Sequence, residues 1–366
     1  MDDRTDIIVI GAGIAGASAA DALAPSARVI VLEQEERAGV HSTGRSAALF
    51  SETYGNAVIR ALSRASRAFL AGPPDGFSET PLIRPRGSLY VAAEDRLDRL
   101  RALEVATGTF ERLSGAEARR RVPILRPEAS AAGLYEPGAM DIDVDALHQG
   151  FLRRLRRRGG QLVTDAPVTA LRREATGWIA TTPRGDVSAP IVINAAGAWA
   201  DRVAVLAGIA PLGLQPKRRT AALIDGPDLD FSGWPLVIDA DETVYFKPDA
   251  GRLLISPADE TDTEPGDAQP DDLDVAVAAD RVERMTTLRV SRVRHRWAGL
   301  RTFAPDRTPV CGFDPREAGF FWLAGQGGYG IQTSSALAAL AARLVLRLPG
   351  DLAELEAALA PDRYAV

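Results

Sequence analysis

Cysteine and lysine are scarce in this chain. Cys311 is the single cysteine among 366 residues, which excludes an intrachain disulfide and does not indicate an oxidising compartment. Lys217 and Lys247 are the only lysines, and the other cationic side chains are arginines. The three histidines have no metal-ligand spacing, so we expect neither a metal site nor a histidine catalyst.

Long apolar runs are also absent. No segment is long enough to span a bilayer, and Ile7–Ile10 is too short for a signal peptide and leads directly into a glycine turn. We therefore expect a cytoplasmic protein without a transmembrane segment. The net charge of −6 does not favour nucleic acid. We interpret the run Arg153–Arg158 as the solvated last turn of a helix, where cations suit the helix dipole.

The start of the chain carries a complete dinucleotide-binding pattern. The strand Ile7–Ile10 runs into Gly11, Gly13 and Gly16, and after a small-residue helix a second strand ends at Glu33. The glycines permit a sharp turn, close approach of a pyrophosphate and close packing of the helix. The helix N-terminus adds N–H groups and a positive dipole end. Glu33 can accept from a ribose 2′-OH and would repel a 2′-phosphate, which argues against NADP.

The same α/β character returns twice along the chain. Residues Asp145–Arg158 are predicted to form a helix, and Pro190–Gly197 contains an apolar strand that ends in small residues. Gly319–Ala324 is predicted to be another strand, and a helix follows over Thr333–Leu348. These segments extend the nucleotide-binding sheet.

The intervening stretches differ in pattern. Leu82–Val91 and Leu236–Ser256 alternate like strands, and the acidic segment Asp259–Asp274 is predicted to be an exposed loop. We predict an α/β chain of two domains, in which a mainly antiparallel sheet domain is inserted into a Rossmann-like domain. The nucleotide-binding domain is expected to comprise residues 1–78, 141–211 and 296–366, and the substrate domain residues 79–140 and 212–295.

Several strings of the sequence resemble one family. The FAD-dependent amino-acid oxidoreductases of the D-amino-acid oxidase superfamily, which include glycine and sarcosine oxidases, have similar segments over nearly the whole chain. Within that family the likeness is strongest to bacterial D-arginine dehydrogenases. The strings are His41–Ala48, Asp145–Gly150, Leu212–Arg219, Trp297–Arg301 and Gln326–Thr333.

The resemblance implies that FAD is held by the first glycine turn, the loop after Glu33 and three later segments. The implied residues are Gly11, Gly13, Ile14, Ala15, Gly16, Glu33, Gln34, His41, Ser42, Thr43, Gly44, Arg45, Ser46, Ala47, Ala48, Val168, Ala196, Gly197, Gly327, Gly328, Tyr329, Gly330 and Ile331. Covalent sarcosine oxidases attach flavin through a cysteine that would fall near Gly299, so we expect noncovalent FAD. The lysine that they use for oxygen has no counterpart in residues 252–274, which favours a quinone or another acceptor over O2.

The resemblance also implies a reaction and the residues that carry it. A D-amino acid would transfer hydride from Cα to flavin N5, and the imino acid would hydrolyse to a 2-oxo acid and ammonia. Arg219 and Arg301 would hold the substrate carboxylate, because a guanidinium fork makes two parallel bonds to it. Tyr54 and Tyr245 would line the site, and the Gly328 carbonyl would accept from the amine.

Two positions depart from the D-arginine dehydrogenase pattern. Ser88 replaces the glutamate that meets the substrate guanidinium, and Leu49 replaces a pocket histidine. We therefore expect neutral or apolar side chains to be preferred over cationic ones. A sarcosine- or glycine-type oxidase of secondary amines is the first alternative, and a flavin-binding protein without catalysis is the second. The oligomeric state is not predicted.

Overall fold

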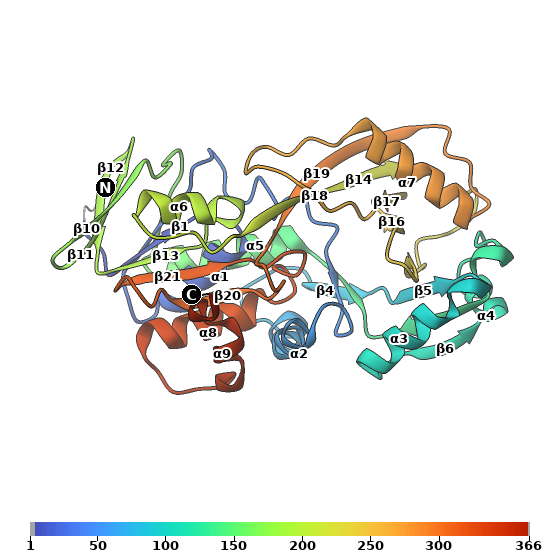
Figure 1. The fold of residues 1–366 in the computed structure, drawn as a ribbon, viewed down its shortest axis with the longest axis horizontal. Helices are drawn as coiled ribbons and strands as arrows, with labels where there is room; N and C mark the ends of the chain where they lie inside the picture. Colours follow the sequence, from blue (N-terminus) through green and yellow to red (C-terminus); the bar gives the residue numbers. More distant parts are fainter. Residues whose placement is uncertain (1–3, 365–366) are drawn as a thin grey trace.

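A six-stranded sheet forms the half of the molecule that carries both termini (Figure 1). The computed structural model describes residues 4–364. The sheet order is β20-β21-β13-β1-β2-β9, and every neighbouring pair is parallel except β20 and β21. Its strands are β1 (Ile7–Ile10), β2 (Val29–Leu32), β9 (Gln161–Val163), β13 (Ile191–Asn194), β20 (Val310–Phe313) and β21 (Phe320–Ala324).

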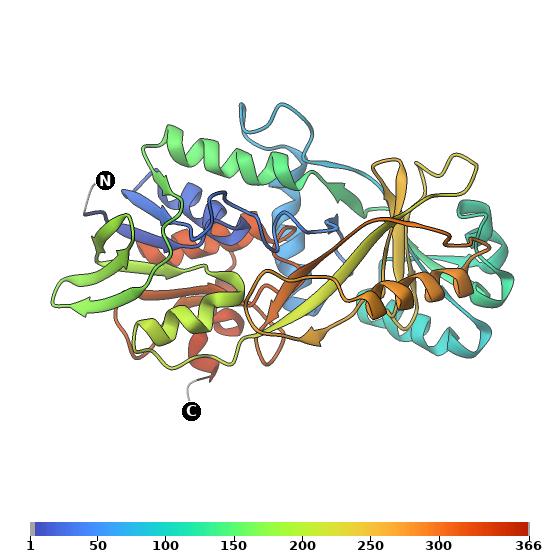
Figure 2. The same ribbon diagram turned by 90° about the horizontal axis from the view of Figure 1, so that it is seen from above.

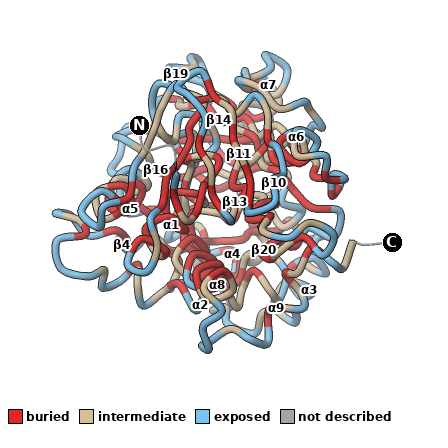
Figure 3. The backbone as a smooth tube through the Cα atoms, turned by 90° about the vertical axis from the view of Figure 1, so that its left-hand side faces the viewer, coloured by how far each residue is buried: buried red, intermediate tan, exposed pale blue. Residues whose placement is uncertain are grey.

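Alternate residues of β1 pack into two hydrophobic cores on opposite faces of the sheet. Ile7 and Val9 pack toward α1 and α8, whereas Ile8 and Ile10 pack toward α6 and a three-stranded antiparallel sheet that includes the buried Trp178. Figure 1 shows α6 and α8 on opposite sides of the central strands, and Figure 3 shows buried residues concentrated there. The covering elements are α1 (Ile14–Leu23), α5 (Val144–Arg157), α6 (Ala200–Leu206), α8 (Ser334–Leu346), α9 (Glu356–Leu359), β10 (Ala170–Glu174), β11 (Gly177–Thr182) and β12 (Gly185–Ala189).

The other half is built on a nine-stranded, mostly antiparallel sheet. Its order is β18-β14-β17-β16-β15-β5-β7-β6, with β19 paired to β14, and β5 runs parallel to β15. The long strands β14 and β19 extend from between the halves into this sheet (Figure 2). The strands are β5 (Ser88–Ala92), β6 (Glu111–Ser114), β7 (Ala132–Glu136), β14 (Gln215–Ile224), β15 (Leu236–Asp239), β16 (Tyr245–Asp249), β17 (Arg252–Ser256), β18 (Thr261–Asp262) and β19 (Val293–Phe303).

Smaller elements complete the fold. A short sheet in the order β3-β8-β4 lies where the chain crosses between the two halves. Helices α3, α4 and α7 pack on the nine-stranded sheet. Their bounds are β3 (Leu49–Phe50), β4 (Ile83–Pro85), β8 (Met140–Ile142), α2 (Ala57–Ala71), α3 (Leu97–Thr107), α4 (Gly115–Arg121) and α7 (Asp272–Met285). Over residues 4–364, none of the helices has both the length and the apolar character that a membrane crossing requires.

The predicted α/β fold with an antiparallel second sheet is confirmed, and one segment is corrected. Residues 259–274 are not simply an exposed loop: Thr261–Asp262 forms β18, and α7 begins at Asp272. Asp259 is largely buried because its carboxylate accepts from the Thr220 N–H at 2.6 Å. The domain boundaries stay a prediction, and the one expected at 295/296 falls inside β19.

Gly16 fixes how closely α1 packs on the sheet. A Cβ at this position would lie 1.9 Å from the Gly11 carbonyl oxygen and 3.2 Å from a Val9 methyl group. Gly16→Ala should therefore lower the free energy of unfolding by about 1–3 kcal/mol, because overpacking forces the helix away from the strand. Denaturant titration measures the loss. Gly266→Ala, where a Cβ meets nothing within 4 Å, is the control; equal stability of the two variants would contradict the packing argument.

Candidate active site

A cavity of about 870 Å³ lies where the carboxyl ends of β1 and β13 meet β19. The glycine turn, the loop after Glu33 and the turn before α8 line it together. All but four of the predicted cofactor residues line this cavity, so most of the segments that the sequence singled out do converge. The exceptions are Gly16, Gly44, Ala48 and Tyr329.

Each exception has a local reason. Gly16 makes the helix–strand contact described above, and the Gly44 N–H donates to the Gly39 carbonyl at 2.8 Å to close a turn. Ala48 lines a second, smaller cavity instead. The Tyr329 ring packs on Tyr54, with ring centroids 4.8 Å apart, and so points away from the larger cavity.

The glycine turn is held by side chains as well as by backbone. The Ala12 N–H donates to Glu33 Oε2 at 2.7 Å, and the Ile14 N–H donates to Thr43 Oγ1 at 3.0 Å. The sequence predicted free N–H groups at this helix start, but these two have partners within the protein. Burial raises the pKa of Glu33, although hydrogen bonds from the Glu35 and Ala12 N–H groups oppose the shift.

His148 supports the same turn from α5. It is buried, and its Nε2 donates to the Ala12 carbonyl at 2.8 Å, so Nε2 carries the proton. A Cβ on Gly39 would lie 2.8 Å from the His148 ring, so the loop after Glu33 also rests on this side chain. Burial lowers the pKa of His148, because the charged form is poorly solvated there.

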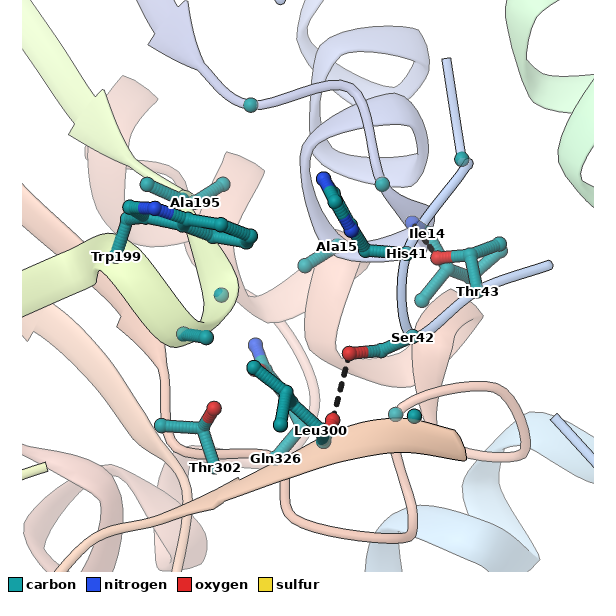
Figure 4. Close-up of a pocket in the computed structure, with 18 of the residues that line it drawn as sticks. Ile14, Ala15, His41, Ser42, Thr43, Ala195, Trp199, Leu300, Thr302 and Gln326 are labelled. Carbon is teal, nitrogen blue, oxygen red and sulfur yellow. Dashed lines mark hydrogen bonds between the residues drawn. The ribbon is translucent and has the colours of Figure 1, made fainter. Parts of the chain in front are cut away.

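The loop after Glu33 is joined directly to β19. Ser42 Oγ donates to the Leu300 carbonyl at 2.6 Å (Figure 4), and an Arg45 Nη1 donates to the Ala298 carbonyl at 3.1 Å. In return, Trp297 Nε1 donates to the Arg45 carbonyl at 2.9 Å. These bonds hold Arg301, the next residue after Leu300, beside the cavity.

The larger cavity suits a flavin dinucleotide. Two buried nitrogen atoms of its lining, His41 Nδ1 and Gln326 Nε2, have no hydrogen-bond partner among the described residues. Trp199 lies beside His41, with ring centroids 4.8 Å apart (Figure 4), and offers an aromatic surface. Trp199 stands in no pattern that singles it out, and Gln326 entered only as the first residue of the string Gln326–Thr333, without a predicted contact to the cofactor. Polar edges and an aromatic wall are what a heteroaromatic ring system requires.

Cys311 lies outside this cavity. It is buried in β20, and burial raises the pKa of its thiol. Gly299 stands in the cavity wall, where a Cβ would only touch Arg45. Among residues 4–364, no group of His, Cys, Asp and Glu is arranged to hold a metal ion. Noncovalent attachment of a flavin stays a prediction.

A smaller cavity of about 110 Å³ opens beside the larger one. One face of the nine-stranded sheet forms a wall, and Tyr54 and Leu49 lie on another side. The residues that line both cavities include four predicted to be catalytic, namely Arg219, Arg301, Tyr245 and Gly328. The structure therefore brings the five predicted catalytic residues to one junction.

The two arginines at the junction differ in their partners. Arg219 donates from Nε to the Asp259 carbonyl at 2.8 Å and from Nη2 to Glu260 at 3.3 Å. Arg301 donates from Nη1 to the Tyr54 hydroxyl at 3.3 Å, and no carboxylate among residues 4–364 forms a salt bridge with it. Arg301 is thus the unneutralised cation, whereas Arg219 is already held by Glu260.

Tyr245 lies under the influence of both arginines. Burial of the phenol favours its neutral form, but the charges of Arg301 and Arg219 more than compensate, so the pKa of Tyr245 is lowered. Gly328 approaches from the other side, and a Cβ there would lie 2.8 Å from the Arg301 guanidinium. The backbone of the turn before α8 can therefore approach the Arg301 guanidinium only because position 328 is a glycine.

Ser88 has a carboxylate directly behind it. It pairs in register with Glu136 on β7, and its hydroxyl donates to Glu136 Oε2 at 3.2 Å. Ser51 and Thr53 donate to the same oxygen at 2.8 and 2.7 Å, and the Glu52 N–H donates to Oε1 at 3.0 Å. Comparison with the D-arginine dehydrogenase pattern indicated that an acid is absent at position 88. The sequence gave no indication that the buried carboxylate of Glu136 lies next to this position.

The fold and these cavities define a flavin-dependent oxidoreductase, and comparison with known proteins gives the family. The model of the FAD dependent oxidoreductase family matches residues 6–344, so the chain belongs to that family and its cofactor is FAD.

Individual relatives lie at modest identity. Glycine oxidase of Geobacillus kaustophilus is 25% identical, over 95% of this chain and 94% of its own length. Its crystal structure superposes with a TM-score of 0.83 at 24% identity, covering 96% of this chain and 98% of that one, and shows the same fold. Dimethylglycine dehydrogenase of Mus musculus is 25% identical over 99% of this chain. The chain spans about half the length of several such curated relatives. The expected likeness to D-arginine dehydrogenase stays a prediction.

The buried His148 gives a pH test of the glycine turn. Because its pKa is lowered on folding, the unfolded chain binds a proton at His148 more readily than the folded chain does. The stability that this residue contributes is present above its usual pKa of about 6.5 and is lost as the pH falls below it. His148→Gln keeps a donor for Ala12 but does not titrate. The free energy of unfolding of the wild type, relative to this variant, should fall between about pH 7.5 and about pH 5.5; parallel pH profiles would contradict the assignment.

Proposed function

We propose that this protein oxidises the C–N bond of a small amino acid, with D-amino acids as the first candidates. The observation that carries the proposal is Arg301. It is a cation at the junction of the two cavities, and within the described residues no carboxylate forms a salt bridge with it, although Glu242 of the smaller cavity interacts with it electrostatically. Arg301 is partly buried. A guanidinium withdrawn from water needs an anionic partner, and a substrate carboxylate has the matching bidentate geometry.

The residues at the junction have distinct roles in this proposal. Arg301 binds the substrate carboxylate, and the Tyr54 hydroxyl, which already accepts from Arg301, donates its own proton to that carboxylate. Tyr245 covers the other side and excludes water. The Gly328 carbonyl accepts from the substrate amine, which orients the Cα–H toward the larger cavity. FAD held there would supply a hydride acceptor for that carbon, and the imine formed would hydrolyse in water.

Arg219 has a secondary role here. Glu260 already neutralises it, and Glu260 is in turn bound by Arg307 at 2.9 and 3.0 Å. We infer that Arg219 contributes positive electrostatic potential and forms one side of the cavity wall. Arg301 contributes most of the affinity for the substrate carboxylate. This division is a finer form of the expectation from the sequence that Arg219 and Arg301 together hold the carboxylate.

Cationic side chains are disfavoured in this proposal. Ser88 offers only a hydroxyl to the cavity, and the Glu136 carboxylate behind it is covered by four donors. A guanidinium that entered would lose water without gaining a direct carboxylate partner. Neutral D-amino acids are therefore preferred to D-arginine.

A secondary amine is the second candidate. Two of the relatives named above are a glycine oxidase and a dimethylglycine dehydrogenase, and the same carboxylate site would hold an N-methylated glycine. An acceptor other than O2 is part of the proposal as well. The experiment below therefore separates the two substrate classes before an acceptor is added.

Anaerobic mixing with a panel of amines tests the proposed function. The panel contains neutral D-amino acids, their L-enantiomers, D-arginine, sarcosine and dimethylglycine, and the readout is loss of the oxidised flavin absorbance. We expect reduction by neutral D-amino acids and slower reduction by D-arginine. Reduction by sarcosine or dimethylglycine alone would select the second candidate. A flavin that no member reduces would contradict the proposal.

Replacement of each arginine separates their roles. Arg301→Met should raise KM about 100-fold, because a buried charge-assisted bond is worth roughly 3 kcal/mol. Arg219→Met, which removes a guanidinium already paired with Glu260, is the matched control and should raise KM by about tenfold or less. Steady-state kinetics at equal flavin content provide both values. An unchanged KM in the Arg301 variant would remove that residue from the carboxylate site.

A further inference from the structure

Lys247 is the one buried lysine among the described residues, and it lies in the wall of the smaller cavity. It is 5% exposed, whereas Lys217 lies on β14 in an ion pair with the exposed Asp262 and lines neither cavity. On β16, Lys247 stands two residues after Tyr245, so both side chains point to the same face of the sheet. Both indeed line the smaller cavity.

Among residues 4–364, Lys247 shares its one carboxylate partner with Arg86. Its Nζ lies 2.8 Å from Asp141 Oδ1, and the guanidinium of Arg86 lies 2.6 Å from Oδ2 of the same carboxylate. Two cations therefore share one anion in a mostly buried setting. An ammonium has three N–H donors, and Asp141 is the one carboxylate that forms a salt bridge with Lys247 in the described part of the chain.

The other carboxylates near this cavity do not neutralise the lysine. Glu136, Ser88 and Leu236 form one row across three adjacent strands, and extending the register that pairs Val237 with Phe246 places Lys247 next in this row. Glu136 is covered by its four donors. Glu242 lies in the turn before β16, where it interacts electrostatically with Arg219 and Arg301.

Lys247 also lines a further cavity of about 650 Å³ together with Asp141 and Arg86, but the cavity that it shares with Arg301 is the smaller one. A substrate held at Arg301 would therefore meet Lys247 in the smaller cavity.

We propose that Lys247 binds a second carboxylate of the substrate, so that the preferred substrate is a short acidic amino acid. This inference rests on the proposed function, with the α-carboxylate at Arg301. Tyr245, which lines both cavities together with Arg301, stands about 7 Å from Lys247 along the strand, so the two proposed carboxylate sites open to the same small cavity. The cavity is thereby selective by charge: Lys247 attracts an anionic side chain and repels a cationic one. The expected order of preference is then acidic side chains first, neutral side chains second and cationic side chains last.

The test compares each acid with its amide, which has nearly the same shape. Anaerobic flavin reduction is measured with D-aspartate and D-glutamate against D-asparagine and D-glutamine. In the wild type we expect the acids to show an apparent Kd about tenfold or more below that of the amides. Lys247→Met should abolish this difference and leave the amides within about threefold. Lys217→Met, the matched control, should retain the preference.

A binding measurement keeps the inference separate from turnover. Succinate, which carries two carboxylates and no amine, should perturb the flavin spectrum of the wild type and bind at least about tenfold more weakly to Lys247→Met. Lys247→Gln keeps a donor toward Asp141 and replaces the methionine variant if that variant does not fold. Acids that bind no better than amides, or a preference that survives in the Lys247 variants, would overturn the inference. If neutral substrates still reduce the flavin, the proposed function stands; if none does, the succinate titration alone decides on Lys247.

Discussion

The seam between the loop after Glu33 and strand β19 is the contact on which the site depends. Ser42 and Arg45 donate to carbonyl oxygens of β19, and Trp297 donates back to Arg45. β19 belongs by pairing to the nine-stranded sheet, whereas the loop belongs to the nucleotide-binding turn. The bonds thus connect the two halves at the place where cofactor and substrate must meet. A shift of either half would move Arg301 relative to the larger cavity, where we expect FAD to bind.

Partial burial of Arg301 without a salt bridge to a carboxylate is the second constraint. An unneutralised cation in this position costs folding free energy, and the surrounding structure limits that cost with the hydroxyl of Tyr54 and the close backbone of Gly328. Arg219 shows the alternative, because Glu260 satisfies it within the chain. The contrast explains why two arginines at one junction have different consequences. Only the charge that the fold leaves unpaired remains fully available to a ligand.

The sequence predicted the nucleotide-binding half well, because local patterns determine it. Gly11, Gly13, Gly16 and Glu33 stand within one βαβ unit, and their spacing follows from backbone geometry. The resemblance extended this to Arg301 and Tyr245, which lie on long strands whose register the sequence pattern alone does not reveal. The contacts of Trp199 and Gln326 with the larger cavity were not predicted, since their places in it arise from chain segments that meet only in the folded molecule.

Glu136 and Lys247 show most clearly what a one-dimensional comparison leaves out. Position 88 alone suggested that an acid had been lost, yet strand pairing places Glu136 directly opposite Ser88. The same sheet places Leu236 and then Lys247 on the other side of Ser88. The two ends of this row therefore have opposite charges. Hydroxyl groups, among them that of Ser88, cover the Glu136 carboxylate, and Asp141 is the salt-bridge partner of the Lys247 ammonium. Selectivity at such a site depends on which charge binds the substrate, and we infer that this charge is the ammonium of Lys247.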